Sequence, residues 1–417
     1  MTSRNLSYKT LVRRNFSSRL WMVALTLLGC ISALLLPLFV VQQWYQTRME
    51  RYAENVAHGV SYAITQEEIL KNAQEDIYML LSFDNIAIKI VLFVLACICG
   101  IAMFRYLHDR QQIDFFHALP INRKHLFALN YVSGILSVLP LFLIVYIISV
   151  GTAAAMGLGS MLTGSILLQN VLGHIFFFLL NYTIAVLCTV LTGNTIIAIL
   201  LAMWVQCSVP LFMLMYQFWQ GFYYTTYAGV SSRQLAIMLG GSPVVKYCLS
   251  TTHVQDIDYL TYGTVTAGGT GALIYPVVGT LIFLALAYVL FVRRKSECAG
   301  IALAFPKIKT PLQAYMCLFM GSAFAMLFKA IFSGQESWKW FGLIFGVVLC
   351  HAVVEIICEF DFKAIFQHWK QMLILCVVAV AVLVGMQTDV LGFDSYVPKE
   401  SDIVGVGLRS SSDDRYY

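Results

Sequence analysis

A long stretch without charge constrains the fold of this chain more than any other feature. No Asp, Glu, Lys or Arg occurs between Lys124 and Arg233. A helix needs about 20 apolar residues to cross the hydrocarbon core of a bilayer, so this stretch alone is long enough for about three spans. Of all 417 residues, 59% are hydrophobic and 12% are charged, whereas soluble domains carry about 25% charged residues. The sequence therefore predicts an all-α polytopic membrane protein.

The apolar segments of the sequence predict about nine transmembrane helices. We expect these spans at residues 20–41, 86–104, 127–150, 171–191, 195–216, 272–292, 312–332, 338–357 and 371–386. Basic residues concentrate in the short segments that this count places on the cytoplasmic side, which predicts a cytoplasmic N-terminus and an external C-terminus. The net charge of +5 follows from this bias and does not indicate nucleic-acid binding.

The two longest polar segments are predicted to lie outside the membrane and to contain short helices. In the acidic loop 42–85, the run Thr65-Gln66-Glu67-Glu68 is typical of a capped helix start, and that helix should extend to Leu81. In the loop 217–271, the pieces 234–239 and 244–249 flank a Gly-Gly-Ser-Pro break. Each piece is too short to span, so we expect two short helices that dip into the outer leaflet.

A polar island at residues 105–127 contains the strongest candidate for a functional site. Its basic residues predict a cytoplasmic loop, and its centre is the apolar string Phe115-Phe116-His117-Ala118-Leu119-Pro120, which follows Asp114. Exposed aromatic residues with a polar rim usually mark a contact surface. The alternative is a helix at the lipid interface whose two phenylalanines lie among the headgroups.

Three ionisable residues inside predicted spans are weaker candidates. His351 and Glu355 are spaced i, i+4 and share one helix face, and His174 lies in the fourth predicted span. Such groups could couple transport to protons. A structural role is favoured for His351 and Glu355, because they lie near the predicted cytoplasmic end of their helix.

Other polar residues in the spans are expected to be structural. Asn130, Asn181 and Gln206 should bond to neighbouring helices, and Lys89 should extend its ammonium group to the interface. The sequence contains no Walker A motif, nucleophile elbow, dinucleotide loop or zinc-ligand spacing. We therefore expect no enzyme activity, catalytic residue, metal or cofactor in this chain.

Two strings resemble a known family. Asp114 to Phe127, DFFHALPINRKHLF, resembles the first intracellular loop of bacterial ABC-2-type permeases, which are similar to type V exporters. Arg294 to Gly300, RKSECAG, is similar to the segment that closes the six-span core of that family. The resemblance covers about residues 1–300 and implies a 20–300 permease core with coupling loop 105–127. The pattern of charge and hydropathy alone predicts an interfacial helix at 1–19, three further spans within 301–388 and an extracellular tail at 389–417.

The resemblance also implies a function and partners. The chain would be the permease subunit of an ATP-driven exporter in the bacterial plasma membrane, paired with an identical or homologous second permease. Docking on a separate ATP-binding subunit, which would hold ATP and magnesium, would use residues of the coupling loop: Phe115, Phe116, His117, Leu119 and Pro120. The cargo would be amphiphilic: a lipid, a peptide antibiotic or a drug.

Other functional classes stay open at the sequence level. An ion-coupled secondary transporter would use groups such as His174 or Glu355 near the midplane. A membrane-embedded transferase or protease would need a convergent polar cluster, and the polar residues here are scattered. A sensor or interaction protein that does not transport is the third alternative.

Overall fold

The computed structural model describes residues 20–59, 64–118, 121–227, 229–250, 271–332, 335–366, 368–390 and 392–395. The segment predicted at 1–19, residues 251–270 of the second outer loop, and residues 391 and 396–417 of the predicted tail lie outside these residues. Among the described residues, nine helices are long and apolar enough to cross a membrane, and no β-strand is present. The predicted all-α polytopic membrane fold is therefore confirmed.

The described part of the chain is built almost entirely of helices. In chain order they are α2 (Leu20–Cys30), the π-helix η1 (Ile31–Leu35), α3 (Leu36–Ala57), α4 (Gln66–Leu81), α5 (Ile86–Phe104), η2 (Arg105–His108), α6 (Arg110–Ala118), α7 (Arg123–Ala155), α8 (Gly164–Leu191), α9 (Thr195–Tyr223), α10 (Ser232–Gly240), α11 (Pro243–Leu249), α12 (Gly271–Arg293), η3 (Ser296–Cys298), η4 (Pro306–Ile308), α13 (Lys309–Ile331), α14 (Ser337–Glu359), η5 (Phe362–Phe366) and α15 (Trp369–Gln387).

The chain divides into two compact units. Unit 1 comprises residues 1–213, 231–314 and 353–365, and unit 2 comprises residues 214–230, 315–352 and 366–417. The helices α9, α13 and α14 therefore contribute to both units. The predicted division at residue 300 stays a prediction.

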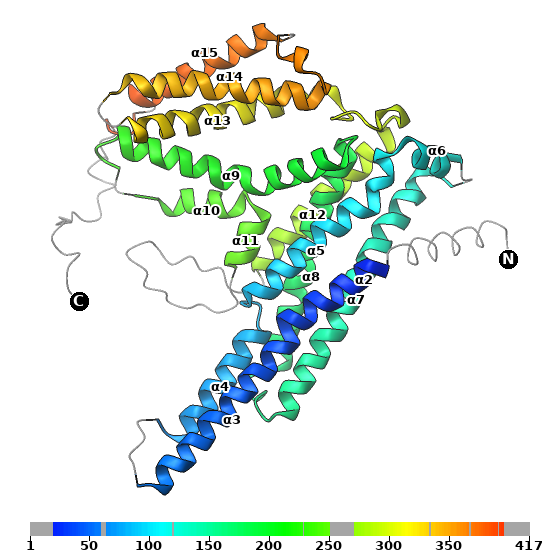
Figure 1. The fold of residues 1–417 in the computed structure, drawn as a ribbon, viewed down its shortest axis with the longest axis vertical. Coiled ribbons are helices and arrows are strands. Elements are labelled where there is room, and N and C mark those ends of the chain that lie inside the picture. The colour runs from blue at the N-terminus through cyan, green and yellow to red at the C-terminus, as the bar shows by residue number, and fades with distance from the viewer. Residues whose placement is uncertain are drawn as a thin grey trace. The chain divides into compact units, whose positions relative to one another are not determined.

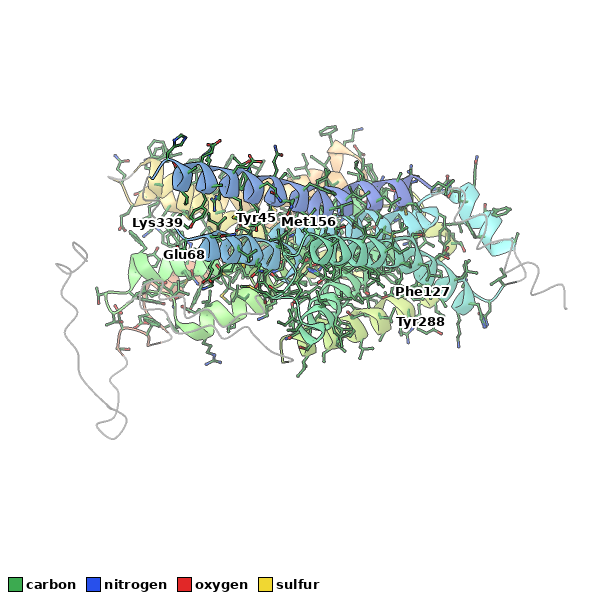
Figure 2. The ribbon with its side chains drawn as sticks, turned by 90° about the horizontal axis from the view of Figure 1, so that it is seen from below. Tyr45, Glu68, Phe127, Met156, Tyr288 and Lys339 are labelled. Atoms are coloured by element: carbon green, nitrogen blue, oxygen red, sulfur yellow. The ribbon has the colours of Figure 1, made fainter. Side chains whose placement is uncertain are left out.

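Helix α8 is the centre of unit 1. It packs against α5 on one side and α12 on another, and every residue from Leu180 to Val190 is buried. A helix that is apolar all round is expected to be enclosed by others, which explains the absence of a polar face in its sequence. Figure 2 shows Phe127 of α7 near Tyr288 of α12, and their rings lie 5.6 Å apart.

An antiparallel pair of helices extends from one end of unit 1, while α6 lies at the opposite end (Figure 1). The pair is α3 and α4, and α4 begins with a capping box. The Thr65 hydroxyl accepts from the Glu68 amide at 3.3 Å, and the Glu68 carboxylate accepts from the Thr65 amide at 2.8 Å. The predicted helix start and its end at Leu81 are confirmed.

The predicted short helices of the second outer loop are also present, as α10 and α11. Lys89 holds α11 in place, which differs from its expected position at the interface. Its side chain is buried, and Nζ donates to the carbonyl groups of Ser250 at 2.6 Å and Cys248 at 3.3 Å. A helix C-terminus has unpaired carbonyl groups and a partial negative charge, so a lysine there supplies both hydrogen bonds and opposite charge.

In unit 2, α13 and α14 approach closely through glycines. A Cβ atom at Gly342 would lie 2.6 Å from the Phe324 carbonyl oxygen, and one at Gly346 would lie 2.7 Å from the Met320 carbonyl oxygen. Glycines four residues apart on one face let two membrane helices bring their backbones together. The sequence 342–346 therefore sets the distance between these two helices.

We expect Gly346→Ala to destabilise the protein by about 1–3 kcal/mol, because the added methyl group must push α14 away from the α13 backbone. Thermal unfolding in detergent measures this effect. Gly385→Ala in α15 is the matched control, because a Cβ atom there would meet no described heavy atom within 4 Å. Equal melting temperatures for the two variants would contradict the close packing.

The residues after α15 bind the end of α9 within unit 2. The Asp394 carboxylate accepts hydrogen bonds from the Thr225 amide at 2.9 Å and the Thr226 amide at 3.0 Å, and from both threonine hydroxyls. These bonds, with the Thr226 hydroxyl first, lower the pKa of Asp394 to about 2. An unfolded aspartate has a pKa of about 3.9.

Since the folded pKa is the lower one, Asp394 stabilises the fold above about pH 4 and loses this contribution as the pH falls toward 2. We expect Asp394→Asn to melt below the wild type at pH 6. The difference should shrink steadily between pH 4 and pH 2, as measured by thermal unfolding across that range. A difference that stays constant with pH would show that the charge of Asp394 is irrelevant.

Candidate functional site

The short helix α6 is fixed at its start by its own cap. One oxygen of the Asp109 carboxylate accepts from the Gln111 amide at 2.9 Å, and the other accepts from the Gln112 side-chain amide at 3.0 Å. After α6, the Asn122 side chain caps α7 by accepting from the Lys124 amide at 3.3 Å. Such caps satisfy amide groups that have no partner inside their helix. The polar island therefore contains a helix, α6, whose start is capped, and it leads to the capped start of α7.

The inner face of α6 carries Ile113 and Phe116, three residues apart. Ile113 is buried, and Phe116 is half-buried with its ring centroid 4.5 Å from that of Tyr106. Tyr106 itself is buried in the core of unit 1. Phe116 therefore anchors α6 to the end of α5.

The outer face of α6 carries Gln111, Asp114, Phe115 and Ala118, all of which are exposed. Phe115 is 46% exposed, and its ring meets that of Phe116 edge to face at 5.6 Å. Of the residues predicted to dock a partner, the structure brings Phe115 to the surface and turns Phe116 toward the core. Leu119, Pro120 and the side chain of His117 lie outside the described residues.

Arg294 is the buried residue that joins this region to the rest of unit 1. Its Nη1 atom donates to the carbonyl groups of Thr189 at 3.2 Å, Val190 at 2.5 Å and Thr192 at 2.5 Å, and its Nη2 atom donates to Leu107 at 2.9 Å. The last carbonyl groups of a helix have no partner within it. Burial lowers the pKa of Arg294 to about 10, so the guanidinium stays charged near neutral pH. It therefore supplies charged hydrogen-bond donors to the carbonyl groups at the end of α8.

The segment that follows Arg294 binds α7 and α6. Arg123 of α7 donates through Nη1 to the Arg294 carbonyl at 2.8 Å, and Arg110 of α6 donates through Nε to the Ala299 carbonyl at 3.4 Å. We call residues 294–304 the closing segment. The sequence marked this segment only by its resemblance to the end of a six-span core, and these contacts were not predicted.

The closing segment also binds the turn at residues 192–194, which lies between α8 and α9. Gly193 donates to the Ala302 carbonyl at 3.2 Å and accepts from the Gly300 amide at 2.8 Å. Any side chain at Gly193 would overlap the Cys298 carbonyl oxygen. A glycine in a tight turn after a span is the signal that could have pointed to this close contact.

The ionisable residues predicted inside the spans have structural partners. The buried Glu355 carboxylate pairs with Lys309 at 2.9 Å and accepts from the Gln313 amide at 3.1 Å, and Lys309 also pairs with Glu359 at 2.8 Å. His351 lies one turn before Glu355 in α14 and is buried. This geometry supports the structural role favoured for Glu355.

The cluster at the other end of unit 1 positions the short helices. A ring nitrogen of His174 lies 2.7 Å from the Tyr247 hydroxyl of α11. Gln206 donates to the Asn181 side chain at 2.8 Å, which confirms the expected bond between helices, and accepts from the Val244 amide at 3.1 Å. His174 is therefore a partner of α11, and Asn130 is buried elsewhere in α7.

No protein-family model, curated protein or solved structure matches this chain. The nine apolar helices of its described part fit a transporter-like, multi-pass membrane protein.

We expect Arg294→Gln to destabilise the protein by about 3 kcal/mol or more, because it removes charge-assisted bonds and leaves buried carbonyl groups without donors. Thermal unfolding in detergent tests this. The neighbouring Arg293→Gln removes the same charge from an exposed position and should change stability by less than about 0.5 kcal/mol. If both variants melt alike, Arg294 does not hold the end of α8.

Proposed function

We propose that this chain is the membrane-spanning permease subunit of an ATP-driven exporter of the ABC-2 type in a bacterial plasma membrane. The observation that supports this proposal best is the construction of α6. It presents an exposed phenylalanine, Phe115, on a nine-residue helix that is anchored to the segments directly after α5 and α12. A loop that only reversed the chain would need neither the exposed ring nor the anchors.

In this proposal, α6 is the coupling helix and docks on a separate ATP-binding subunit. Phe115 would enter an apolar pocket of that subunit, and the adjacent exposed Asp114 would face a basic or polar rim. ATP and magnesium would be held by the partner, since this chain has no phosphate-binding motif. A second permease, identical or homologous, would complete the transporter.

The anchors of α6 define a path for motion in this proposal. Phe116 connects α6 to the end of α5 through Tyr106, and Arg110 connects it to the closing segment after α12. Closure of the ATP-binding subunits would move α6 and would displace these spans together. The cargo would be amphiphilic, because the described spans present apolar faces and hold Lys89 and Glu355 in internal contacts.

The test is co-purification from native membranes in mild detergent. Wild-type protein should recover an ATP-binding subunit, identified by mass spectrometry, and should show ATP hydrolysis. Phe115→Asp should lose both at unchanged melting temperature, because the exposed ring contributes little to the fold of the isolated chain.

Phe362→Asp is the matched control, because Phe362 is also exposed (77%) and lies in a predicted cytoplasmic loop away from α6 in the sequence. It should retain the partner. Recovery of folded wild type without any ATP-binding subunit, or equal loss with both variants, would refute the proposed function.

A further inference from the structure

A polar pocket lies beside α6 in unit 1. It is formed by η2, the start of α6 and the start of α9. Its lining residues are Arg105, His108, Asp109, Arg110, Gln112 and Thr195. The pocket is open to the surface, and the proposed docking of Phe115 does not use it.

The pocket offers two arginine side chains to an incoming anion. Arg105 is exposed and makes no hydrogen bond or ion pair with any described residue, and Arg110 uses only Nε, toward Ala299. The carboxylate of Asp109 also lines the pocket, but it forms no ion pair with either arginine among the described residues and accepts bonds from Gln111 and Gln112. Two guanidinium groups against one carboxylate leave the pocket with an excess of positive charge. A guanidinium group matches the oxygens of a phosphate in charge and geometry.

The pocket lies where two spans end. Arg105 directly follows α5, and Thr195 is the first residue of α9. Both residues are therefore expected at the depth of the lipid headgroups on the predicted cytoplasmic side. Basic pockets between membrane helices on that side are suited to anionic lipid headgroups.

An exposed apolar stripe begins at the pocket and continues along α9. It consists of Ile196 (68% exposed), Leu200 (51%) and Met203 (61%). The spacing i, i+4, i+7 places the three side chains on one helix face. A ligand with its phosphate in the pocket could therefore lay an acyl chain along this stripe.

We propose that this pocket binds the phosphate group of an anionic phospholipid of the cytoplasmic leaflet, with an acyl chain along the stripe on α9. The stripe favours a lipid over an acidic segment of a protein partner, because an acidic peptide would gain nothing from an apolar surface that continues into the membrane. The bound lipid would join the start of α6 to the start of α9. This site does not depend on the proposed ATP-binding partner.

Native mass spectrometry of the full chain in detergent tests the proposal by titration with dioleoylphosphatidylglycerol. Wild type should bind one such lipid more tightly than dioleoylphosphatidylcholine, and Arg105→Gln should weaken this binding about fivefold. The double variant Arg105→Gln/Arg110→Gln should weaken it further. Raising the salt concentration should reduce the preference for the anionic lipid, because the contact is partly exposed.

The control variant is Lys124→Gln/Arg293→Gln, which removes two charges from exposed positions of the same predicted side outside the pocket. It should retain wild-type affinity. If the double variant misfolds, Arg105→Gln alone still tests the proposal. Arg105 makes no hydrogen bond with a described residue, so its replacement removes no such bond from the fold.

Two further ligands test whether the bound anion is a lipid headgroup, a free phosphate or an acidic peptide. Inorganic phosphate and a hexaglutamate peptide should each compete poorly with the lipid. Equal lipid affinity in wild type and Arg105→Gln would overturn the proposal, as would equal loss in the control. Tighter binding of phosphate or of hexaglutamate than of phosphatidylglycerol would also overturn it, and the latter would favour a protein partner.

Discussion

The hydrogen bonds of Arg294 are the interaction on which the rest of this region depends. The C-terminal half of α8, Leu180 to Val190, is buried, so the carbonyl groups at its end lie inside protein where water cannot pair with them. An unpaired buried carbonyl group is costly, and one guanidinium satisfies three of them together with the Leu107 carbonyl. Because Arg294 follows α12, these bonds fix the end of one span to the end of another. The closing segment begins at Arg294, and α6 follows Leu107 in the chain, so the positions of both depend on these bonds.

The same physical problem has a second solution at the C-terminal end of α11 in unit 1. There Lys89 supplies its ammonium group to the carbonyl groups of Cys248, in the last turn of α11, and of Ser250, which follows it. From their positions in the sequence, Lys89 and Arg294 would be expected at the membrane interface. Both are instead buried, and each bonds to the end of a helix. A cation in an apolar protein gains most where several carbonyl groups converge, because their partial charges add.

The sequence predicts those features that depend on local chemistry. Apolar length determines the spans, Thr65 and Glu68 form a local cap, and the Gly-Gly-Ser-Pro break separates α10 from α11. The contacts of Arg294 with the end of α8 join residues that are far apart in the chain, so no local pattern reveals them. The orientation of α6 could not be predicted either. Adjacent phenylalanines look equivalent in sequence, and only the position of Tyr106 decides that Phe116 faces inward.

The ionisable groups of the described spans bear on where energy could enter this protein. Glu355 is paired with Lys309, and Lys89 and His174 are bonded to α11 and the residue that follows it. A proton-coupled transporter needs a group that can change its charge during the cycle, whereas these groups make contacts that hold helices together. The proposed function places the source of energy outside the chain. Among the described side chains of α6, Phe115 is the only large apolar one that is exposed. In the proposed function, the partner subunit would act at this helix on the segments that follow α5 and α12.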